Sequence, residues 1–354
     1  MKTMILYFLL VTAIGGAVAN NMTSAKGLPS TNVFRPGLAK GYSDFRIPAI
    51  VRTDKGTLLA FAEARTTGAD ASVHQIAVRR STDNGKSWGP LAFAAGSDAH
   101  WVGNPTAVFT ADNKAMLVYV KHNKTCAGDC GTGNGMVTSS DDGLTWSADT
   151  DLSAMFGPAS GSLPGPGAAL QLRADGGPHA GRILVPSHHG PYERDYVSVS
   201  DDGGTTWRTI ATTFPKMDEA QMTQLANGSI VLNMRHACAP EHVRGVSFSH
   251  DGGDTFSAIS FDTALISPVC QASIATIAGK TYFSNPASKT ARDNITIRRS
   301  SDNAATWPDA LLVQPAATSG YTCLVDTPIA PGTGGILFED VQNTISFAAF
   351  PLDF

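Results

Sequence analysis

The chain has 354 residues, of which 42% are hydrophobic and 16% are charged, and its formal net charge is −4. A chain of this length and composition can bury a large core, as a globular protein does. The small negative charge provides no overall basic field, so nucleic-acid binding has no electrostatic support. Glycine (35) and proline (20) are abundant, which favours many turns over long helices.

The first 19 residues have the pattern of a secretory signal peptide. Lys2 provides a positive charge, Met4 to Ile14 form an apolar run, and Ala17-Val18-Ala19 fits a small-x-small cleavage site. As a helix this run would rise only about 16 Å, which is too short to cross a bilayer. We therefore expect a cleaved signal peptide over 1–19 and a secreted or lysosomal protein, with a membrane anchor or a buried segment as the alternative.

Sequons and cysteines agree with a secretory route. Four Asn-x-Ser/Thr triplets predict a glycoprotein, and they begin at Asn21, Asn123, Asn227 and Asn294. Cys126 and Cys130 lie four positions apart, where a local disulfide is expected in an oxidising compartment. No second Cys or His pair stands at ligand spacing, which disfavours a metal site. The other cysteines are Cys238, Cys270 and Cys323. They leave an odd thiol, so we expect at least one buried free cysteine.

A turn motif of the form Ser-x-Asp-x-Gly-x-Thr/Ser-Trp recurs five times. The copies begin at Ser81, Ser139, Ser200, Ser249 and Ser300. The fourth copy has Phe256 for tryptophan, and the fifth has Ala304 for glycine. In such a turn the aspartate accepts hydrogen bonds from following N–H groups, the glycine permits a positive φ, and the tryptophan packs on adjoining strands. We therefore interpret these aspartates, such as Asp83 and Asp141, as structural rather than catalytic.

Short apolar strands accompany the turns and complete the repeat. Five precede the motifs and one follows the last, at 57–61, 115–119, 182–185, 229–232, 280–283 and 344–348. A repeat of roughly 50 to 65 residues suits one four-stranded sheet per unit. The sequence therefore predicts an all-β, six-bladed β-propeller that forms a single domain over 20–354. A strand near 32–35 would close the ring and leave few free edges.

The segment Phe45-Arg46-Ile47-Pro48 lies upstream of the first turn motif. Propellers host unrelated functions, so residues near the axis must decide the chemistry. Together with the five turns, this segment resembles the exo-sialidase (neuraminidase) family of bacteria and animals, from about residue 40 to the C-terminus. The resemblance implies a hydrolase that removes terminal sialic acids from glycoproteins, glycolipids or oligosaccharides, with no cofactor and no metal.

The resemblance assigns three arginines to the carboxylate of the sialic acid. Arg46 stands in the segment above, Arg235 ends an Asn-x-Arg segment, and Arg292 follows an Asn-Pro pair. Guanidinium groups bind carboxylates through charge-assisted, partly bidentate hydrogen bonds, which suits this role better than lysine. Arg298 and Arg299, which flank the fifth turn, compete with Arg292.

The resemblance also assigns three catalytic residues. Tyr321 is the nucleophile, Glu219 is its base, and Asp70, nine residues before an Arg-Arg pair, is the general acid. A neutral phenol avoids the repulsion that a carboxylate nucleophile would meet at an anomeric carbon bearing a carboxylate, and tyrosine is the recorded nucleophile of sialidases. The ordinary pKa of a phenol is about 10, so it needs a base. Asp70 would protonate the leaving oxygen and then activate water, with retention of configuration.

Competing residues stay open for several of these roles. Asp218 competes with Glu219, and Tyr196 and Tyr282 compete with Tyr321. We also assign Arg65 and Asn104 to further contacts with the sugar, with a turn role as the alternative for both. The neighbouring histidines His188 and His189 would point to opposite faces of a strand, so they form no metal set.

Alternative functions also follow from the same residues. A trans-sialidase or a hydrolase that prefers a deaminated sialic acid would share the core residues. An inactive propeller that only binds sialic acid would not need Tyr321, Glu219 and Asp70 together, so their presence disfavours it.

Overall fold

The structure is a computed structural model that describes residues 26–354 except 71, 98–99, 123–130, 155, 158–160, 175–178 and 238–241. The expected signal peptide over 1–19 lies outside the described residues. So do the predicted Cys126–Cys130 disulfide, Cys238 and the sequons at Asn21 and Asn123. In the part of the chain that is described, no helix is long and apolar enough to cross a membrane.

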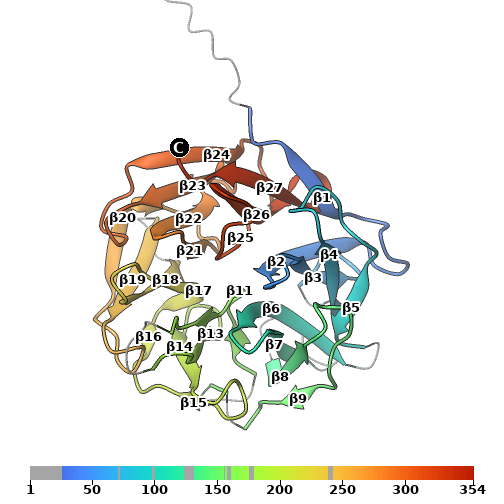
Figure 1. Cartoon of the computed structure of the whole chain (residues 1–354), viewed down its shortest axis with the longest axis horizontal. Helices are drawn as coiled ribbons and strands as arrows, with labels where there is room; N and C mark the ends of the chain where they lie inside the picture. Colours follow the sequence, from blue (N-terminus) through green and yellow to red (C-terminus); the bar gives the residue numbers. More distant parts are fainter. Residues whose placement is uncertain are drawn as a thin grey trace, which may run out of the picture.

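Six sheets radiate from a central axis, and in three of the four-stranded sheets the strands lie in chain order from the axis to the rim (Figure 1). Blade one contains β2 (Asp44–Arg52), β3 (Leu58–Arg65), β4 (His74–Ser81) and β5 (Ala92–Ala95). Blade two contains β6 (Trp101–Thr110), β7 (Lys114–His122), β8 (Gly131–Ser139), β9 (Thr150–Asp151) and β11 (Gly167–Ala168). Blade three contains β10 (Leu163–Pro164), β12 (Leu170–Gln171), β13 (Ile183–His189), β14 (Arg194–Ser200), β15 (Arg208–Thr209) and β16 (Phe214–Pro215).

The remaining blades repeat the four-stranded pattern. Blade four contains β17 (Met217–Gln224), β18 (Ile230–His236), β19 (Val243–Ser249) and β20 (Ser260–Ile266). Blade five contains β21 (Ser273–Ile277), β22 (Lys280–Pro286), β23 (Ile295–Ser300) and β24 (Asp309–Gln314). Blade six contains β25 (Thr322–Leu324), β26 (Thr333–Asp340), the 3₁₀ turn η1 (Val341–Asn343), β27 (Thr344–Pro351) and β1 (Ser30–Phe34). The prediction of a six-bladed β-propeller is confirmed.

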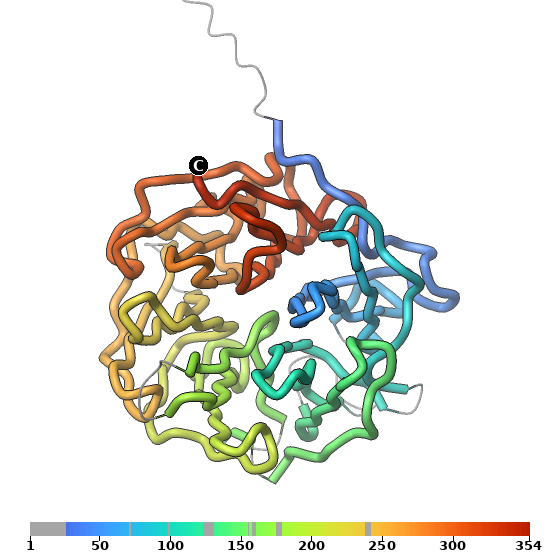
Figure 2. Tube along the Cα trace, in the orientation of Figure 1, coloured from blue at the N-terminus to red at the C-terminus, as the bar shows by residue number. Residues whose placement is uncertain are grey.

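The ring is closed by the first described strand. The chain passes around the axis from its N-terminal to its C-terminal part, so that β1 lies beside the last blade (Figure 2). β1 pairs antiparallel with β27, with Ser30 opposite Ala348. The closing strand spans Ser30–Phe34, slightly earlier than the predicted 32–35. This pairing removes a free edge from blade six and ties the two ends of the propeller together.

The hydrophobic core lies between the blades. Buried residues form a cluster between each pair of neighbouring blades in the described part of the chain. β3 is buried at every position because neighbouring blades cover both of its faces, and its first five residues, from Leu58 to Ala62, are all apolar. Cys270 and Cys323 are free and buried, which confirms the expectation of a free buried cysteine.

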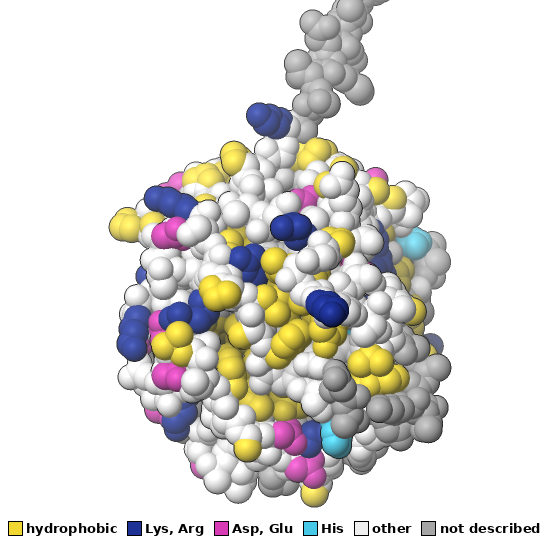
Figure 3. All heavy atoms as spheres, turned by 90° about the vertical axis from the view of Figure 1, so that its right-hand side faces the viewer, with side chains coloured by type: hydrophobic (Ala, Val, Ile, Leu, Met, Phe, Trp, Pro, Cys, Tyr) yellow, Lys and Arg dark blue, Asp and Glu magenta, His cyan; other side chains and the backbone are white. Residues whose placement is uncertain are grey.

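Each rim turn is held by its own aspartate. In the second turn, Asp141 accepts hydrogen bonds from Ser139 Oγ (2.8 Å) and from the N–H and Oγ1 of Thr145 (2.9 and 2.5 Å). The turn tryptophan, Trp146, then packs edge-on against Phe61 of the preceding blade, with ring centroids 5.5 Å apart. The turns therefore close their own hairpins and also join neighbouring blades. On the side of the propeller in Figure 3, lysine and arginine side chains are scattered rather than gathered into one patch.

Candidate active site

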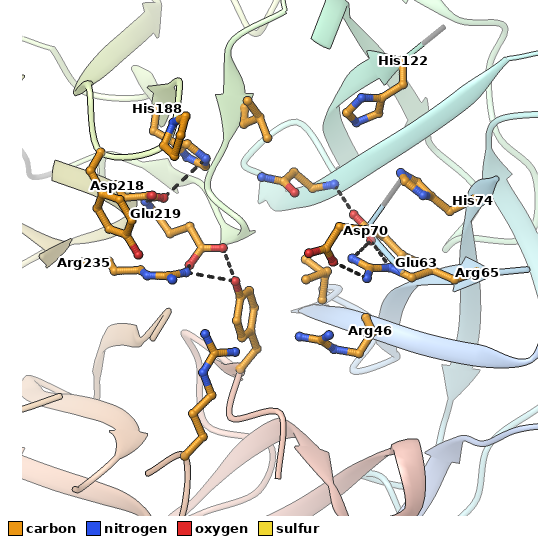
Figure 4. Close-up of a pocket in the computed structure, with 17 residues that line it drawn as sticks. Arg46, Glu63, Arg65, Asp70, His74, His122, His188, Asp218, Glu219 and Arg235 are labelled. Carbon is orange, nitrogen blue, oxygen red and sulfur yellow. Dashed lines mark hydrogen bonds and ion pairs between the residues drawn. The ribbon is translucent and has the colours of Figure 1, made fainter. Parts of the chain in front are cut away.

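The candidate site is a pocket of about 260 Å³ that residues of several blades line (Figure 4). Its walls contain all eight predicted site residues, which are Arg46, Arg65, Asp70, Asn104, Glu219, Arg235, Arg292 and Tyr321. They are spread over more than 270 positions of sequence (321 minus 46 is 275) and come together because the inner strands of the blades converge on the axis. Further lining residues are Ile47, Glu63, His74, His122, Leu163, His188, Pro191, Tyr192 and Asp218.

The three predicted arginines surround Tyr321. The guanidinium carbons of Arg46 and Arg292 lie 5.5 and 5.7 Å from the centre of the Tyr321 ring. Arg235 Nη1 lies 3.2 Å from the Tyr321 hydroxyl oxygen. Arg292 is held by the backbone carbonyls of Ser319 (3.0 Å) and Val269 (3.3 Å). Three positive charges therefore border one phenol, in an arrangement that suits an anionic ligand.

The competing arginine is part of the rim instead. Arg299 forms an ion pair with Asp309 (2.8 Å), and its guanidinium lies over the ring of Phe354. Neither Arg299 nor its neighbour Arg298 is among the residues that line this pocket. Of the three arginines that the sequence left open, only Arg292 therefore borders Tyr321.

Arg46 is aimed into the pocket by a bulge and by a buried glutamate. The register of β2 against β3 shifts between Arg46 and Ala49, and Ile47 has a φ of 61°. Glu339 of β26 accepts hydrogen bonds from Arg46 Nε (2.5 Å), Ile47 N–H (3.1 Å) and Tyr321 N–H (3.0 Å). Burial alone would lower the pKa of Arg46, but the carboxylate of Glu339 raises it, so the guanidinium stays charged. Glu339 thus fixes an arginine and the tyrosine at once.

Sequence reasoning missed Glu339. Its signal was an acidic pair, Glu339 and Asp340, at the end of β26 directly after an apolar segment, and only 1% of Glu339 is exposed. A buried carboxylate in a strand needs a partner, but the sequence alone does not name one that lies 293 positions away.

Tyr321, Glu219 and Arg235 form a continuous chain of hydrogen bonds. The Tyr321 hydroxyl donates to Glu219 Oε1, and Glu219 Oε2 accepts from Arg235 Nη1 at 2.5 Å. Burial, the largest single influence, favours the neutral form of Glu219. Arg235, His188 and the hydrogen bond from Tyr321 together outweigh it and lower the pKa of this carboxyl. Burial and the adjacent Glu219 carboxylate raise the pKa of Tyr321 well above its usual value. The free site therefore contains a neutral phenol bonded to an ionised base.

The competing residues occupy different surroundings. Asp218 accepts the N–H of Glu219 (2.7 Å) and lies 3.4 Å from His188 Nε2, and burial raises the pKa of its carboxyl. Tyr282 donates to the carbonyl of Leu352 and packs among aromatic residues away from the pocket. Tyr196 belongs to β14 and does not line the pocket. Only Glu219 and Tyr321, of the competing carboxylates and phenols, touch one another.

Asp70 lies on the opposite side of the pocket from Glu219 (Figure 4). Its side chain is 79% exposed and pairs with Arg65 Nη1 at 2.5 Å. Arg65 is itself buried and pairs with Glu63 at 2.6 Å. Burial, the largest single influence, opposes ionisation of Glu63. Arg65, His74 and the N–H of Asn104 together outweigh it and lower the pKa of this carboxyl to about 2. The exposed carboxyl of Asp70 is therefore held in place by Arg65, which is itself fixed by its buried ion pair with Glu63.

Asn104 borders the pocket at a second bulge. Its φ is 51°, its N–H donates to Glu63 Oε1 (2.7 Å), and its side-chain amide donates to the carbonyl of Pro164 (3.3 Å). Asn104 therefore occupies a bulge of β6 and also lines the pocket, and its contact with a sugar stays a prediction. In the described residues, no group of three or more His, Cys, Asp or Glu side chains could hold a metal ion.

Known proteins share this chain's sequence and fold. Residues 56–328 match the family described as BNR repeat-like domain. The sialidase of Micromonospora viridifaciens is 34% identical over 88% of this chain, which spans 52% of that protein's length. A solved Hadza microbial sialidase is 27% identical, with a TM-score of 0.79 over 91% of this chain and 68% of its own.

A second solved structure shares the fold alone. The Ruminococcus gnavus intramolecular trans-sialidase is 18% identical, with a TM-score of 0.77 over 91% of this chain and 97% of its own. The relative from Micromonospora is the stronger comparison, because it combines higher identity with coverage of most of this chain. On the match to the repeat domain and on this identity, the chain belongs to the sialidase family with BNR repeats.

Proposed function

We propose that this chain is an exo-α-sialidase, a glycoside hydrolase that releases terminal sialic acids from glycoproteins, glycolipids or oligosaccharides with retention of configuration. The observation that carries the proposal is the phenol of Tyr321, bonded to Glu219 and bordered by three arginines. A carboxylate next to the reacting carbon would account for all of these groups at once. The family to which the chain belongs supports the same reaction.

Binding begins with the carboxylate of the sugar. Arg46, Arg235 and Arg292 would hold it by charge-assisted hydrogen bonds, and this would bring the anomeric carbon over Tyr321. Glu339 keeps Arg46 in place, so little of the binding energy is lost in ordering that side chain.

The first chemical step joins Tyr321 to the sugar. The phenol oxygen forms a bond to the anomeric carbon while the bond from that carbon to the leaving oxygen breaks. The proton of the phenol passes to Glu219 Oε1, which already accepts it as a hydrogen bond. Asp70 gives its proton to the leaving oxygen, so the departing alcohol is neutral.

The second step frees the enzyme. Asp70 now takes a proton from a water molecule, whose oxygen attacks the anomeric carbon and displaces the phenol oxygen. Glu219 returns its proton to Tyr321. Two inversions at one carbon give net retention.

The test is release of a fluorescent aglycone from an α-sialoside between about pH 4 and about pH 8. Proton NMR of the first-formed sugar distinguishes the products: hydrolysis with retention gives the α-anomer of free sialic acid. First formation of the β-anomer would refute the tyrosine mechanism, and a transfer product would favour the trans-sialidase alternative. No release at any pH would refute the hydrolase.

We further propose that the protein enters the secretory route, to be secreted or lysosomal, and carries N-glycans. The pattern over 1–19 and the two described sequons support this, because Asn227 and Asn294 are both exposed. Mass spectrometry of the protein from a eukaryotic host, before and after removal of N-glycans, tests it. An N-terminus that retains residues 1–19, or unmodified asparagines in all sequons, would contradict it.

A further inference from the structure

Three inner strands leave the regular β ladder where they reach the pocket. The register of β2 shifts at Arg46, and that of β6 shifts at Asn104. In β17 the shift falls between Asp218 and Ala220, so Glu219 is the extra residue with no opposite partner in β18. A bulge bends its strand and re-aims the side chain at that point. In β17 the re-aimed side chain is the proposed base.

The N–H of Glu219 at this bulge is received by a side chain rather than by a neighbouring strand. Asp218 Oδ1 accepts it at 2.7 Å. The next N–H, that of Ala220, donates to the carbonyl of Gly165 at 3.1 Å, so a different segment of the chain holds it. A buried N–H group needs an acceptor, and at Glu219 this acceptor is a carboxylate. The backbone of the bulge therefore depends on where the Asp218 side chain lies.

Asp218 is held in turn by the neighbouring blade. His188 of β13, in blade three, places its Nε2 atom 3.4 Å from Asp218 Oδ1, the same oxygen that accepts the Glu219 N–H. The side chains of His188 and Asp218 are only 5% and 9% exposed, so solvent hardly separates them. Figure 4 shows both beside Glu219, on the side of the pocket away from Asp70. The bulge of blade four is thus braced by a residue of blade three.

The carboxylate of Glu219 must be placed accurately, because it bonds two groups of the site at once. Its Oε1 atom accepts from the Tyr321 hydroxyl, and its Oε2 atom accepts from Arg235 Nη1 at 2.5 Å. Misplacing a catalytic group by about 1 Å can lower a rate about 100-fold. The same capping contact stands at the start of β2, where Asp44 Oδ1 accepts the N–H of Phe45 at 2.9 Å. An aspartate thus precedes the re-aimed residue in both strands.

We propose that Asp218 is a positioning residue for Glu219. Its carboxylate fixes the bulge of β17 through the Glu219 N–H, and His188 keeps that carboxylate in place. The Glu219 side chain is thereby aimed at the phenol of Tyr321. The inference rests on the proposed function, because Asp218 affects the reaction only through the base. Asp218 also lines the pocket, so the experiment must separate this role from a direct contact with the sugar.

The test is a double-mutant cycle on an activated aryl α-sialoside, with kcat and KM measured separately. Asp218→Ala removes the acceptor, whereas Asp218→Asn keeps an oxygen that can accept the same N–H. Asp218→Ala is also combined with Glu219→Ala, which leaves no carboxylate to aim. Asp54→Ala, in an exposed turn of blade one, is the matched control. Thermal melting of each variant checks that the fold is kept.

We expect Asp218→Ala to lower kcat about 10- to 100-fold while KM stays within about threefold of wild type. Asp218→Asn should recover most of this loss. In the Glu219→Ala background, Asp218→Ala should change the remaining kcat by less than about twofold, because its effect passes through Glu219. Asp54→Ala should leave both constants unchanged.

Equal losses of kcat in the two backgrounds would overturn the inference, and so would an unchanged kcat in Asp218→Ala. A loss confined to KM would also overturn it, because it would show that Asp218 binds the sugar. If Asp218→Ala does not fold, His188→Phe takes its place in the cycle. Its loss of kcat should likewise vanish in Glu219→Ala, and a persisting loss would overturn the inference. A wild type that cleaves no sialoside would instead refute the proposed function.

Discussion

Carboxylates support both the rim turns and the axial pocket, but they have different partners there. At the rim, Asp83 and Asp141 accept hydrogen bonds from residues two to four positions away and are only partly buried. At the axis, Glu219 and Glu339 are buried and bond to arginines and to Tyr321 from other strands. The rim carboxylates close local hairpins, whereas the axial ones join distant parts of the chain.

This difference separates stability from activity. A rim aspartate stabilises only its own turn and touches no substrate. Its loss should therefore leave the pocket intact. A buried ion pair is weak support for stability, because desolvation offsets much of its attraction. The axial pairs therefore hold charges where the proposed reaction needs them, and their loss should reduce catalysis more than it unfolds the chain.

The largest effect is expected for Tyr321→Phe. The change deletes one hydroxyl, so the nucleophile is lost while the packing of the ring remains, and kcat should fall at least about 1,000-fold. Steady-state kinetics on an activated α-sialoside measures it, and thermal melting checks that the fold is kept. Activity within tenfold of wild type would show that Tyr321 is not the nucleophile. It would also contradict the view that the axial carboxylates serve catalysis.

Asp70→Ala tests a carboxylate of the axial pocket that, unlike Glu219 and Glu339, is exposed. Because its side chain is 79% exposed, we expect no loss of melting temperature. The rate on a substrate with an alkyl alcohol as leaving group should fall about 100- to 10,000-fold, since that oxygen needs a proton. A phenolic leaving group needs less protonation, so the loss should be much smaller. Equal losses on both substrates would contradict a general acid.

Glu339→Gln should affect both activity and stability. The amide keeps the size but removes the charge that pairs with Arg46, so this guanidinium is left partly buried without its anion. We expect kcat/KM to fall about 10- to 100-fold and unfolding free energy to fall by about 1–3 kcal/mol. Kinetics and chemical denaturation measure the two, with Gln342→Ala in the exposed turn η1 as a control. Unchanged kinetics would show that Arg46 needs no such support.

The same contrast explains what could be predicted from the sequence. The propeller was predictable because each turn is a local device: Asp141 and Thr145 are four positions apart, and the pattern recurs along the chain. The candidate site residues were predictable from their resemblance to a family, and the structure brings all eight to one pocket. Glu339 was missed because its surroundings are created by the closed ring. No short-range pattern marks a glutamate whose partner lies 293 positions away.

Removal of a rim carboxylate should change stability and nothing else. Asp141→Ala deletes the acceptor of the hydrogen bonds from Ser139 and Thr145, so unfolding free energy should fall by about 1 kcal/mol with kcat/KM unchanged. Denaturant titration measures the loss, and Asp54→Ala, in the exposed turn before β3, is the matched control. A loss of activity at the optimum temperature would mean that rim and axis are coupled.

The smallest expected effect is the loss of stability of the rim turns at acid pH. Hydrogen bonds from the side chain and N–H of Thr145 lower the pKa of Asp141 from 3.8 to about 2, and those from Thr306 and Ser300 do the same for Asp302. A lowered pKa in the folded state means that the stabilisation is complete above about pH 4 and is lost as the pH falls toward about 2. Melting temperatures of wild type should therefore decline across this range. The decline should be shallower in Asp141→Asn, because asparagine cannot take up a proton at that site. An identical decline would show that protonation of Asp141 is not coupled to unfolding.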